Sequence, residues 1–303
     1  MKERWQLEAA VIGGDSRQLA VARSLADWFD QVYVVGHPES QIQTPLQWRA
    51  EVSGALAKAQ VVVLPIAGMN DSGMIRGYPD QPPLDFKPYL EQLSPNTLLV
   101  AGSLTKQWRK VAAEHRIHVV EYAEDDEIAI LNSIPTAEGA IQIAMEEMPI
   151  TIHGSTVLVV GFGRVGITVA RSFKALGARV IVTARRAALL ARAVEMGCEV
   201  VGEECLSQSI GAADLIINSV PALVIDAALL GRTRPDVFII DLASPPGGID
   251  FEAVAALKIK AKLYPGLPGI VAPKTAGAIL ASSIPKLIQK FFLENGGVIN
   301  NAV

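Results

Sequence analysis

The segment Thr156-Val-Leu-Val-Val160-Gly161-Phe-Gly163-Arg-Val-Gly166 decides how this chain folds. A short apolar run enters a turn of the form Gly-x-Gly-x-x-Gly, and a helical pattern follows over 164–176. Strand, glycine turn and helix in that order are the dinucleotide-binding fingerprint of a βαβ unit. Gly161 would permit the tight turn, Gly163 the approach of the backbone to a pyrophosphate, and Gly166 the close packing of helix on strand. The alternative is a glycine turn that holds no ligand. We predict a cofactor site in which the helix N-terminus holds the phosphates, formed by Gly161, Phe162, Gly163, Arg164, Val165 and Gly166.

The residues that follow repeat this pattern. Short β-branched runs recur at the spacing expected of βαβ repetition, at 179–183, 214–218, 237–241 and 261–263. We therefore predict a Rossmann-like domain over 132–276. Its linker helix, 132–148, would begin with the polar turn residues Asn-Ser-Ile-Pro-Thr.

The first part of the chain shows a similar alternation. The apolar run 7–12 meets Gly13-Gly14-Asp15 and a helical pattern, and further runs follow at 32–35, 61–65, 98–101 and 118–120. We predict an α/β substrate or partner domain over 1–131, completed by a C-terminal helix at about 277–303. Residues 66–97, rich in Gly and Pro, form the longest loop-like stretch, and long loops are usually functional or mobile. The predicted fold class is α/β, with two Rossmann-like, doubly wound parallel-sheet domains joined by hinge helices.

The end of the second predicted strand of the later domain indicates which dinucleotide is bound. An NAD site usually carries Asp or Glu about 20 residues after the glycine turn, where it binds the ribose hydroxyls. Here that place reads Thr183-Ala184-Arg185-Arg186, with two guanidiniums for a 2′-phosphate and no acid to repel it. We predict NADP rather than NAD; alternatively, the arginines simply begin a solvated helix. Later strand ends should line the same crevice, which adds Asn218, Ser219, Val220, Pro221, Leu242, Ala243 and Ser244.

Two other segments could hold an anionic substrate. The segment Gly13-Gly14-Asp15-Ser16-Arg17 lacks the three-glycine spacing, and we interpret it as a helix start that holds an anion. Arg17 would pair with a substrate carboxylate, or it would be an ordinary surface arginine. The segment 265–276 contains three prolines and two glycines and ends with Lys274-Thr275 at a helix start. It would present Lys274 to a carboxylate, or it would be a stiff hinge with a solvent-facing lysine.

Composition excludes several classes of protein. The 303 residues are 50% hydrophobic and 19% charged with a net charge of −4, so we expect a globular protein without a bulk field toward nucleic acid or an anionic membrane. Two cysteines and four histidines lack the spacing of a disulfide framework or a metal site, and no Gly-x-Ser-x-Gly elbow or P-loop is present. The N-terminus lacks a signal peptide pattern, and every apolar run is short. We expect a cytoplasmic enzyme of hydride chemistry, without a metal.

Four motifs resemble the dipicolinate synthase A-subunit family over nearly the whole chain. They are Gly-Gly-Asp-Ser-Arg-Gln at 13–18, Asn-Ser-Ile-Pro-Thr-Ala-Glu-Gly at 132–139, Leu-Ala-Ser-Pro-Pro-Gly-Gly-Ile-Asp-Phe at 242–251, and Pro-Gly-Leu-Pro-Gly-Ile-Val-Ala-Pro-Lys-Thr-Ala-Gly at 265–277. The resemblance implies an enzyme of the mother-cell cytoplasm of sporulating bacteria. The partner that it implies is a flavoprotein-like B subunit, and we expect a homo-oligomer as well.

The resemblance also implies a reaction. A dihydrodipicolinate-level intermediate would be oxidised to dipicolinate, pyridine-2,6-dicarboxylate, with NADP⁺ accepting the hydride. Asp15, Arg17, Lys274 and the polar turn Ser133 to Thr136 would then contact the small dicarboxylate, and Glu138 or Asp241 would take the ring proton. The expected catalytic set is thus Ser133, Thr136, Glu138, Asp241 and Lys274.

Two alternatives remain open from the residues. The layout also resembles the 2-hydroxyacid dehydrogenases and adenosylhomocysteine hydrolase, so another NADP-dependent dehydrogenase is possible. No general base stands out in the sequence, which also permits a non-catalytic, cofactor-binding regulatory subunit.

Overall fold

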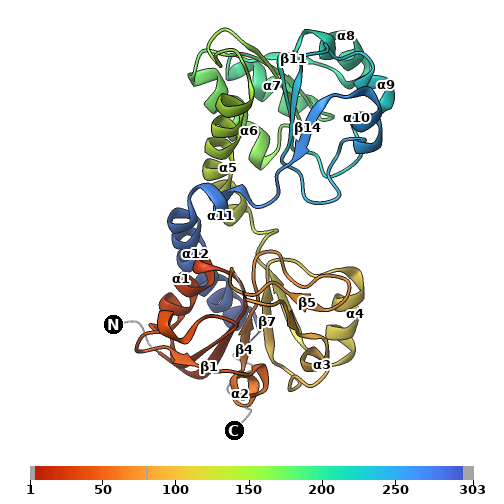
Figure 1. Cartoon of the computed structure of the whole chain (residues 1–303). Coiled ribbons are helices and arrows are strands. Elements are labelled where there is room, and N and C mark those ends of the chain that lie inside the picture. The colour runs from red at the N-terminus through yellow and green to blue at the C-terminus, as the bar shows by residue number, and fades with distance from the viewer. Residues whose placement is uncertain (1–3, 80, 296–303) are drawn as a thin grey trace. The chain divides into compact units, whose positions relative to one another are not determined.

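The computed structural model describes residues 4–79 and 81–295 and divides into two compact units (Figure 1). The first unit contains the chain up to Ala129 together with the part that begins at Pro273, and the second contains Ile130–Ala272. The domain boundaries expected from the sequence were 131 and 276.

The first unit is built on a six-stranded parallel sheet in the order β3-β2-β1-β4-β7-β8. Its strands are β1 (Trp5–Ile12), β2 (Phe29–Val35), β3 (Gln47–Trp48), β4 (Val61–Val63), β7 (Leu98–Ala101) and β8 (His118–Glu121). Its helices are α1 (Ser16–Leu25), α2 (Val52–Leu56), α3 (Lys87–Leu90), α4 (Lys106–Glu114) and α12 (Pro273–Glu294).

The second unit repeats the same topology in the order β11-β10-β9-β12-β13-β14. Its strands are β9 (Thr156–Val160), β10 (Arg179–Thr183), β11 (Glu199–Val201), β12 (Leu215–Asn218), β13 (Phe238–Asp241) and β14 (Lys260–Leu263). The helices are α6 (Arg164–Ala175), α7 (Ala187–Glu195), α8 (Leu206–Ser209), α9 (Ala227–Leu230), α10 (Phe251–Leu257) and α11 (Leu267–Val271). Two parallel, doubly wound sheets confirm the predicted fold class.

Helix α5 (Asp126–Glu147) begins six residues before the predicted linker helix, whose start was placed at Asn132. The expected polar turn over 132–136 is therefore wrong, because these residues lie inside the helix with Pro135 among them. A proline removes one backbone donor from a helix. The carbonyl that loses its helical donor is that of Leu131, four residues before the proline. The two carbonyls next to it accept from side chains: Ser133 Oγ donates to Ile130 O at 2.6 Å, and Thr136 Oγ1 donates to Asn132 O at 2.8 Å.

Within the Gly- and Pro-rich stretch 66–97, the described residues 66–79 and 81–97 form more regular structure than the composition suggests. Strands β5 (Met74–Ile75) and β6 (Leu84–Asp85) pair in antiparallel fashion, and α3 follows them. Ile75, Phe86 and Leu90 are fully buried in the core of the first unit. These apolar anchors hold the stretch against the sheet.

Helix α12 is part of the first unit's core. Leu280, Ile284 and Ile288 are buried in the cluster that contains residues of β1 and α1, and α12 runs beside α1 (Figure 1). The two helices approach closely at Gly277, where an added Cβ would lie 3.2 Å from the Ala20 Cβ. The first unit thus depends on a helix that is distant in sequence from the rest of it.

Truncation of a buried side chain in α12 is expected to destabilise the first unit selectively. Ile284→Ala removes a fully buried side chain, which costs about 2–5 kcal/mol in such positions. All four tryptophans, Trp5, Trp28, Trp48 and Trp108, belong to the first unit, so tryptophan fluorescence in a urea titration reports on it. Gln289→Ala, an exposed change in the same helix, is the control. Coincident curves for Ile284→Ala and the unmodified protein would contradict the role given to α12.

Candidate functional site

Strand ends align along one edge of the second unit's sheet. Thr183, Val160, Asn218 and Asp241 are successive register partners across β10, β9, β12 and β13. The strand order reverses direction between β9 and β12, and ligands of open α/β sheets bind at such a switch point, beyond the carboxyl ends of the strands. This edge is therefore the place where a ligand of the second unit is expected.

The glycine turn after β9 combines tight packing with open space. Gly161 has φ +90°, and a Cβ on Gly166 would lie 2.1 Å from the Gly161 carbonyl oxygen, so helix α6 follows the strand at close range. Gly163 is the N-cap of α6, and nothing lies within 4 Å of the position its Cβ would take. Each glycine has the geometry that a pyrophosphate-binding turn requires, with the open position directly at the helix N-terminus.

The end of β10 carries the groups that would face an adenosine ribose. Thr183 is 2% exposed, and its Oγ1 is buried without a hydrogen-bond partner. Arg185 and Arg186 follow as exposed side chains, and Gly161 N donates to Thr183 O at 3.0 Å, which places this strand end beside the glycine turn. An unpartnered hydroxyl, two guanidiniums and an open helix N-terminus fit the hydroxyls and phosphates of a nicotinamide dinucleotide.

Asp241 holds the strand-end loops together. Its Oδ1 accepts from Asn218 Nδ2 at 2.8 Å and from Ala243 N at 3.0 Å, and its Oδ2 accepts from Gly248 N at 2.8 Å. Asp241 and Asn218 are both 0% exposed. A Cβ on Gly247 would lie 2.5 Å from Asp241 Oδ2, so the loop wraps closely round the carboxylate. This geometry argues against Asp241 as a proton acceptor, because a base must reach the substrate.

The other predicted catalytic residues differ in accessibility. Ser133 is 0% exposed, and its Oγ lies 2.6 Å from Thr168 Oγ1, so it joins α5 to α6 rather than offering a free hydroxyl. Thr136 is half-buried, while Glu138 is exposed on α5. Lys274 is exposed in the first turn of α12, in the first unit. The expected rigid loop before it is mostly helical, because α11 ends at Val271 and α12 begins at Pro273.

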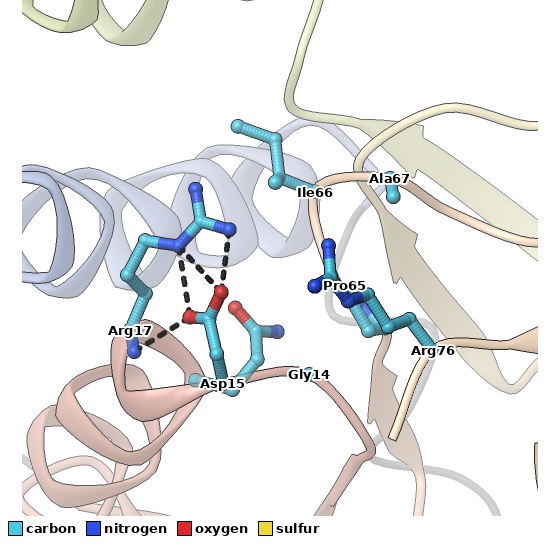
Figure 2. A pocket seen from close by; sticks show the side chains of 8 residues that line it. Gly14, Asp15, Arg17, Pro65, Ile66, Ala67 and Arg76 are labelled. Carbon is cyan, nitrogen blue, oxygen red and sulfur yellow. Dashed lines mark hydrogen bonds and ion pairs between the residues drawn. The ribbon is translucent and has the colours of Figure 1, made fainter. Parts of the chain in front are cut away.

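A second candidate site lies at the corresponding edge of the first unit's sheet. Its strand order reverses between β1 and β4, and a hollow is bordered there by the turn after β1 and the segment after β4 (Figure 2). Gly14 and Asp15 line one side, and Pro65 and Arg76 line the other (Figure 2). The sequence indicated Asp15 and Arg17 but not Arg76, because no local pattern in 66–97 marks that arginine as a neighbour of the β1 turn.

The charges in this hollow are partly paired. Arg17 Nη2 lies 2.7 Å from Asp15 Oδ2, Arg17 Nε lies 2.8 Å from Asp15 Oδ1, and the Arg17 side chain is only 13% exposed. Burial alone would raise the pKa of Asp15, but the hydrogen bonds and charge of Arg17, with the charge of Arg76, hold that pKa below its usual value. Asp15 is therefore ionised at neutral pH and forms an ion pair with Arg17.

The glycine turn of the first unit leaves no space for a pyrophosphate. A Cβ on Gly14 would lie 2.2 Å from Gln18 Cγ, and one on Gly13 would lie 2.7 Å from Arg76 O. Gly14 N also donates to Arg76 O at 2.7 Å. The Gln18 side chain and the Arg76 backbone take up the space at this turn, whereas the space at Gly163 is open.

Across residues 4–79 and 81–295, no group of three or more His, Cys, Asp or Glu side chains is arranged to hold a metal ion. No helix in that part of the chain is long and apolar enough to cross a membrane.

Comparison with known proteins assigns each unit a relative. Residues 8–123 match the family described as the N-terminal domain of the dipicolinate synthase A-subunit, and residues 135–257 match the NAD binding domain of D-isomer specific 2-hydroxyacid dehydrogenases. Over 292 residues the chain is 37% identical to the dipicolinate synthase A-subunit of Bacillus subtilis (strain 168), an alignment that covers 96% of this chain and 98% of that protein.

Solved structures agree with this similarity. The dipicolinate synthase A-subunit from Bacillus halodurans superposes with a TM-score of 0.86 at 38% identity, covering 94% of this chain and 99% of that one. D-lactate dehydrogenase from Escherichia coli, at 17% identity and a TM-score of 0.60, covers 96% of this chain and 98% of its own, and shares the fold.

Asp241→Asn is expected to loosen the second unit. The amide group can replace only one of the two carboxylate oxygens as an acceptor, which leaves a buried N–H without its partner and costs about 1–3 kcal/mol. Amide hydrogen exchange in β12 and β13 measures the loss of protection. Glu138→Gln, which removes an exposed carboxylate from the same unit, is expected to leave exchange unchanged. Unchanged protection in Asp241→Asn together with lost turnover would instead indicate a role in chemistry.

Proposed function

The chain belongs to the dipicolinate synthase A-subunit family, and on that premise we propose that it oxidises a dihydrodipicolinate-level intermediate to dipicolinate with NADP⁺ as hydride acceptor. The second unit is a nicotinamide-dinucleotide-binding domain of the dehydrogenase type. The observation that carries the proposal is the open glycine turn at Gly163 beside the exposed pair Arg185 and Arg186.

The proposed cofactor contacts follow from the geometry of the second unit. Gly163 and the first turn of α6 would hold the pyrophosphate, because helix N-terminal N–H groups lack partners within the helix. Thr183 Oγ1 is a free buried group for a ribose hydroxyl, and Arg185 and Arg186 would pair with the 2′-phosphate of NADP. The turns Asn218–Pro221 and Leu242–Ser244, held by Asp241, would border the nicotinamide end.

The reaction removes one hydride and one proton from the substrate ring. Bound NADP⁺ supplies the hydride acceptor, and the aromaticity of the product favours the oxidation. Lys274 is proposed to hold a substrate carboxylate, since it is an exposed cation at a helix start. Glu138 is proposed to accept the ring proton, because it is the exposed carboxylate among the predicted candidates whereas Asp241 is enclosed.

Ser133 and Thr136 are proposed to position this helix rather than to touch substrate. Ser133 contacts Thr168, and Thr136 contacts the carbonyl of Asn132, so both hydroxyls are engaged within the protein.

Membership in an A-subunit family supports a proposed partner protein. We propose that the chain assembles with further copies of itself and with a flavoprotein-like B subunit. We also propose that it acts in the mother-cell cytoplasm during sporulation. Family membership supports these proposals.

Purified protein mixed with NADP⁺ and the intermediate formed freshly from pyruvate and aspartate semialdehyde tests the reaction. NADPH absorbance and dipicolinate, detected by terbium luminescence, are expected to rise together, and separate arms are run with and without a B subunit. Absence of both signals in both arms would contradict the proposed reaction and favour a non-catalytic cofactor-binding role.

Replacement of Arg185 and Arg186 by Ala is expected to weaken NADPH binding about ten- to hundredfold for each charge-assisted contact that is lost. NADH binding should change little, because NADH lacks the 2′-phosphate. Titration calorimetry with both dinucleotides measures the difference. Arg232→Ala, which removes an exposed guanidinium elsewhere in the second unit, is the control. Equal losses for the two dinucleotides would show that the 2′-phosphate is recognised by other residues.

A further inference from the structure

The hollow of the first unit contains two guanidiniums with different surroundings. Arg17 donates through Nε and Nη2 to both oxygens of Asp15, so its charge is matched within the protein. Arg76 lies across the hollow from this pair (Figure 2) and is exposed. Within residues 4–79 and 81–295 it makes no ion pair. The two guanidiniums and the Asp15 carboxylate leave the hollow with one excess positive charge. Arg76 acts on Asp15 only through its charge, so it is the guanidinium that is not bound to a carboxylate within the protein.

The backbone of Arg76 is fixed even though it lies in the irregular stretch. Its carbonyl oxygen accepts from Gly14 N at 2.7 Å, and the preceding Ile75 is fully buried. A Cβ on Gly13 would lie 2.7 Å from that same carbonyl oxygen. The two glycines of the β1 turn thus admit the Arg76 backbone, and this contact holds the base of its side chain at the switch point of the sheet.

Arg76 also borders a second, larger hollow. That hollow has a volume of about 290 Å³ and shares Ala67 and Arg76 with the first. Met74, Ile75 and Pro83 give it an apolar lining. Small-molecule sites typically combine an apolar wall with a few polar groups that fix orientation. An apolar hollow next to an unmatched guanidinium suits a flat ring that carries a carboxylate.

We propose that Arg76 determines specificity for the dicarboxylate by binding one of its two carboxylates, with the ring against Met74 and Pro83. The planar guanidinium can donate two parallel N–H bonds to a carboxylate, which an ammonium cannot reproduce. Asp15 contributes indirectly: its ion pair with Arg17 leaves Arg76 as the guanidinium that binds the substrate carboxylate. This inference rests on the proposed function, because it assumes a pyridine dicarboxylate as the ligand.

The test compares two ligands that differ by one carboxylate. Titration calorimetry of the full chain with saturating NADPH would measure binding of dipicolinate and of pyridine-2-carboxylate. The unmodified protein is expected to prefer dipicolinate. In Arg76→Ala the affinity for dipicolinate should fall about ten- to hundredfold, and the preference should shrink toward none, because the second carboxylate has lost its partner.

Two further variants make the result specific. Arg76→Lys keeps the charge without the paired N–H geometry and should restore the preference only in part. Arg23→Ala, an exposed change on α1 outside both hollows, should leave the preference unchanged. Tryptophan fluorescence checks that each variant remains folded, and Arg76→Lys serves as the test if Arg76→Ala does not fold.

The outcomes separate this inference from the proposed function. If the unmodified protein forms and binds dipicolinate and Arg76→Ala keeps its preference, the inference is overturned and the proposed function stands. If the unmodified protein neither forms nor binds dipicolinate, the proposed function fails and the inference fails with it. A preference lost in Arg76→Ala and partly restored in Arg76→Lys supports both.

Discussion

The architecture depends on how closely a helix can follow a strand at the switch point of a parallel sheet. In the second unit, Gly166 permits the contact, since any Cβ there would lie 2.1 Å from the Gly161 carbonyl oxygen. The first unit has the same strand order and an equally tight turn at Gly14, where Gln18 fills the space. One topology therefore produces an open turn suited to a dinucleotide and a closed turn that receives a protein backbone.

At the strand-end edges of both units, some charged groups are paired within the protein and others are available to a ligand. The chain is acidic overall, with a net charge of −4, so attraction of an anion depends on local unmatched cations. Asp15 occupies Arg17 in the first unit, and Asp241 is enclosed by donors in the second. At the two strand-end edges, exposed arginines outside those networks are available to ligands: Arg76 at one edge, and Arg185 with Arg186 at the other.

The sequence predicts the fold well because its signals are local. Each βα repeat is marked by a short apolar run, and only short strands such as β3 (Gln47–Trp48) and β11 (Glu199–Val201) were missed. The start of α5 was misplaced because Asn132, Ser133 and Pro135 are typical of turns, whereas in the structure the Ser133 hydroxyl donates to a carbonyl of the helix itself. Arg76 could not be predicted, because its contact with Gly14 joins segments about 60 residues apart.

The motifs that carry the family resemblance combine structural and chemical roles that composition cannot separate. Ser133 is the polar residue that links α5 to α6, and Gly247 and Gly248 enclose the carboxylate of Asp241. A buried polar group is costly to leave unpaired, so such residues are constrained by folding alone. Lys274 and Glu138 in the same motifs are exposed, so folding buries neither charge. A motif residue becomes a candidate for chemistry when the fold leaves its polar atoms free, and by that criterion the charged, accessible members of these motifs outrank the buried ones.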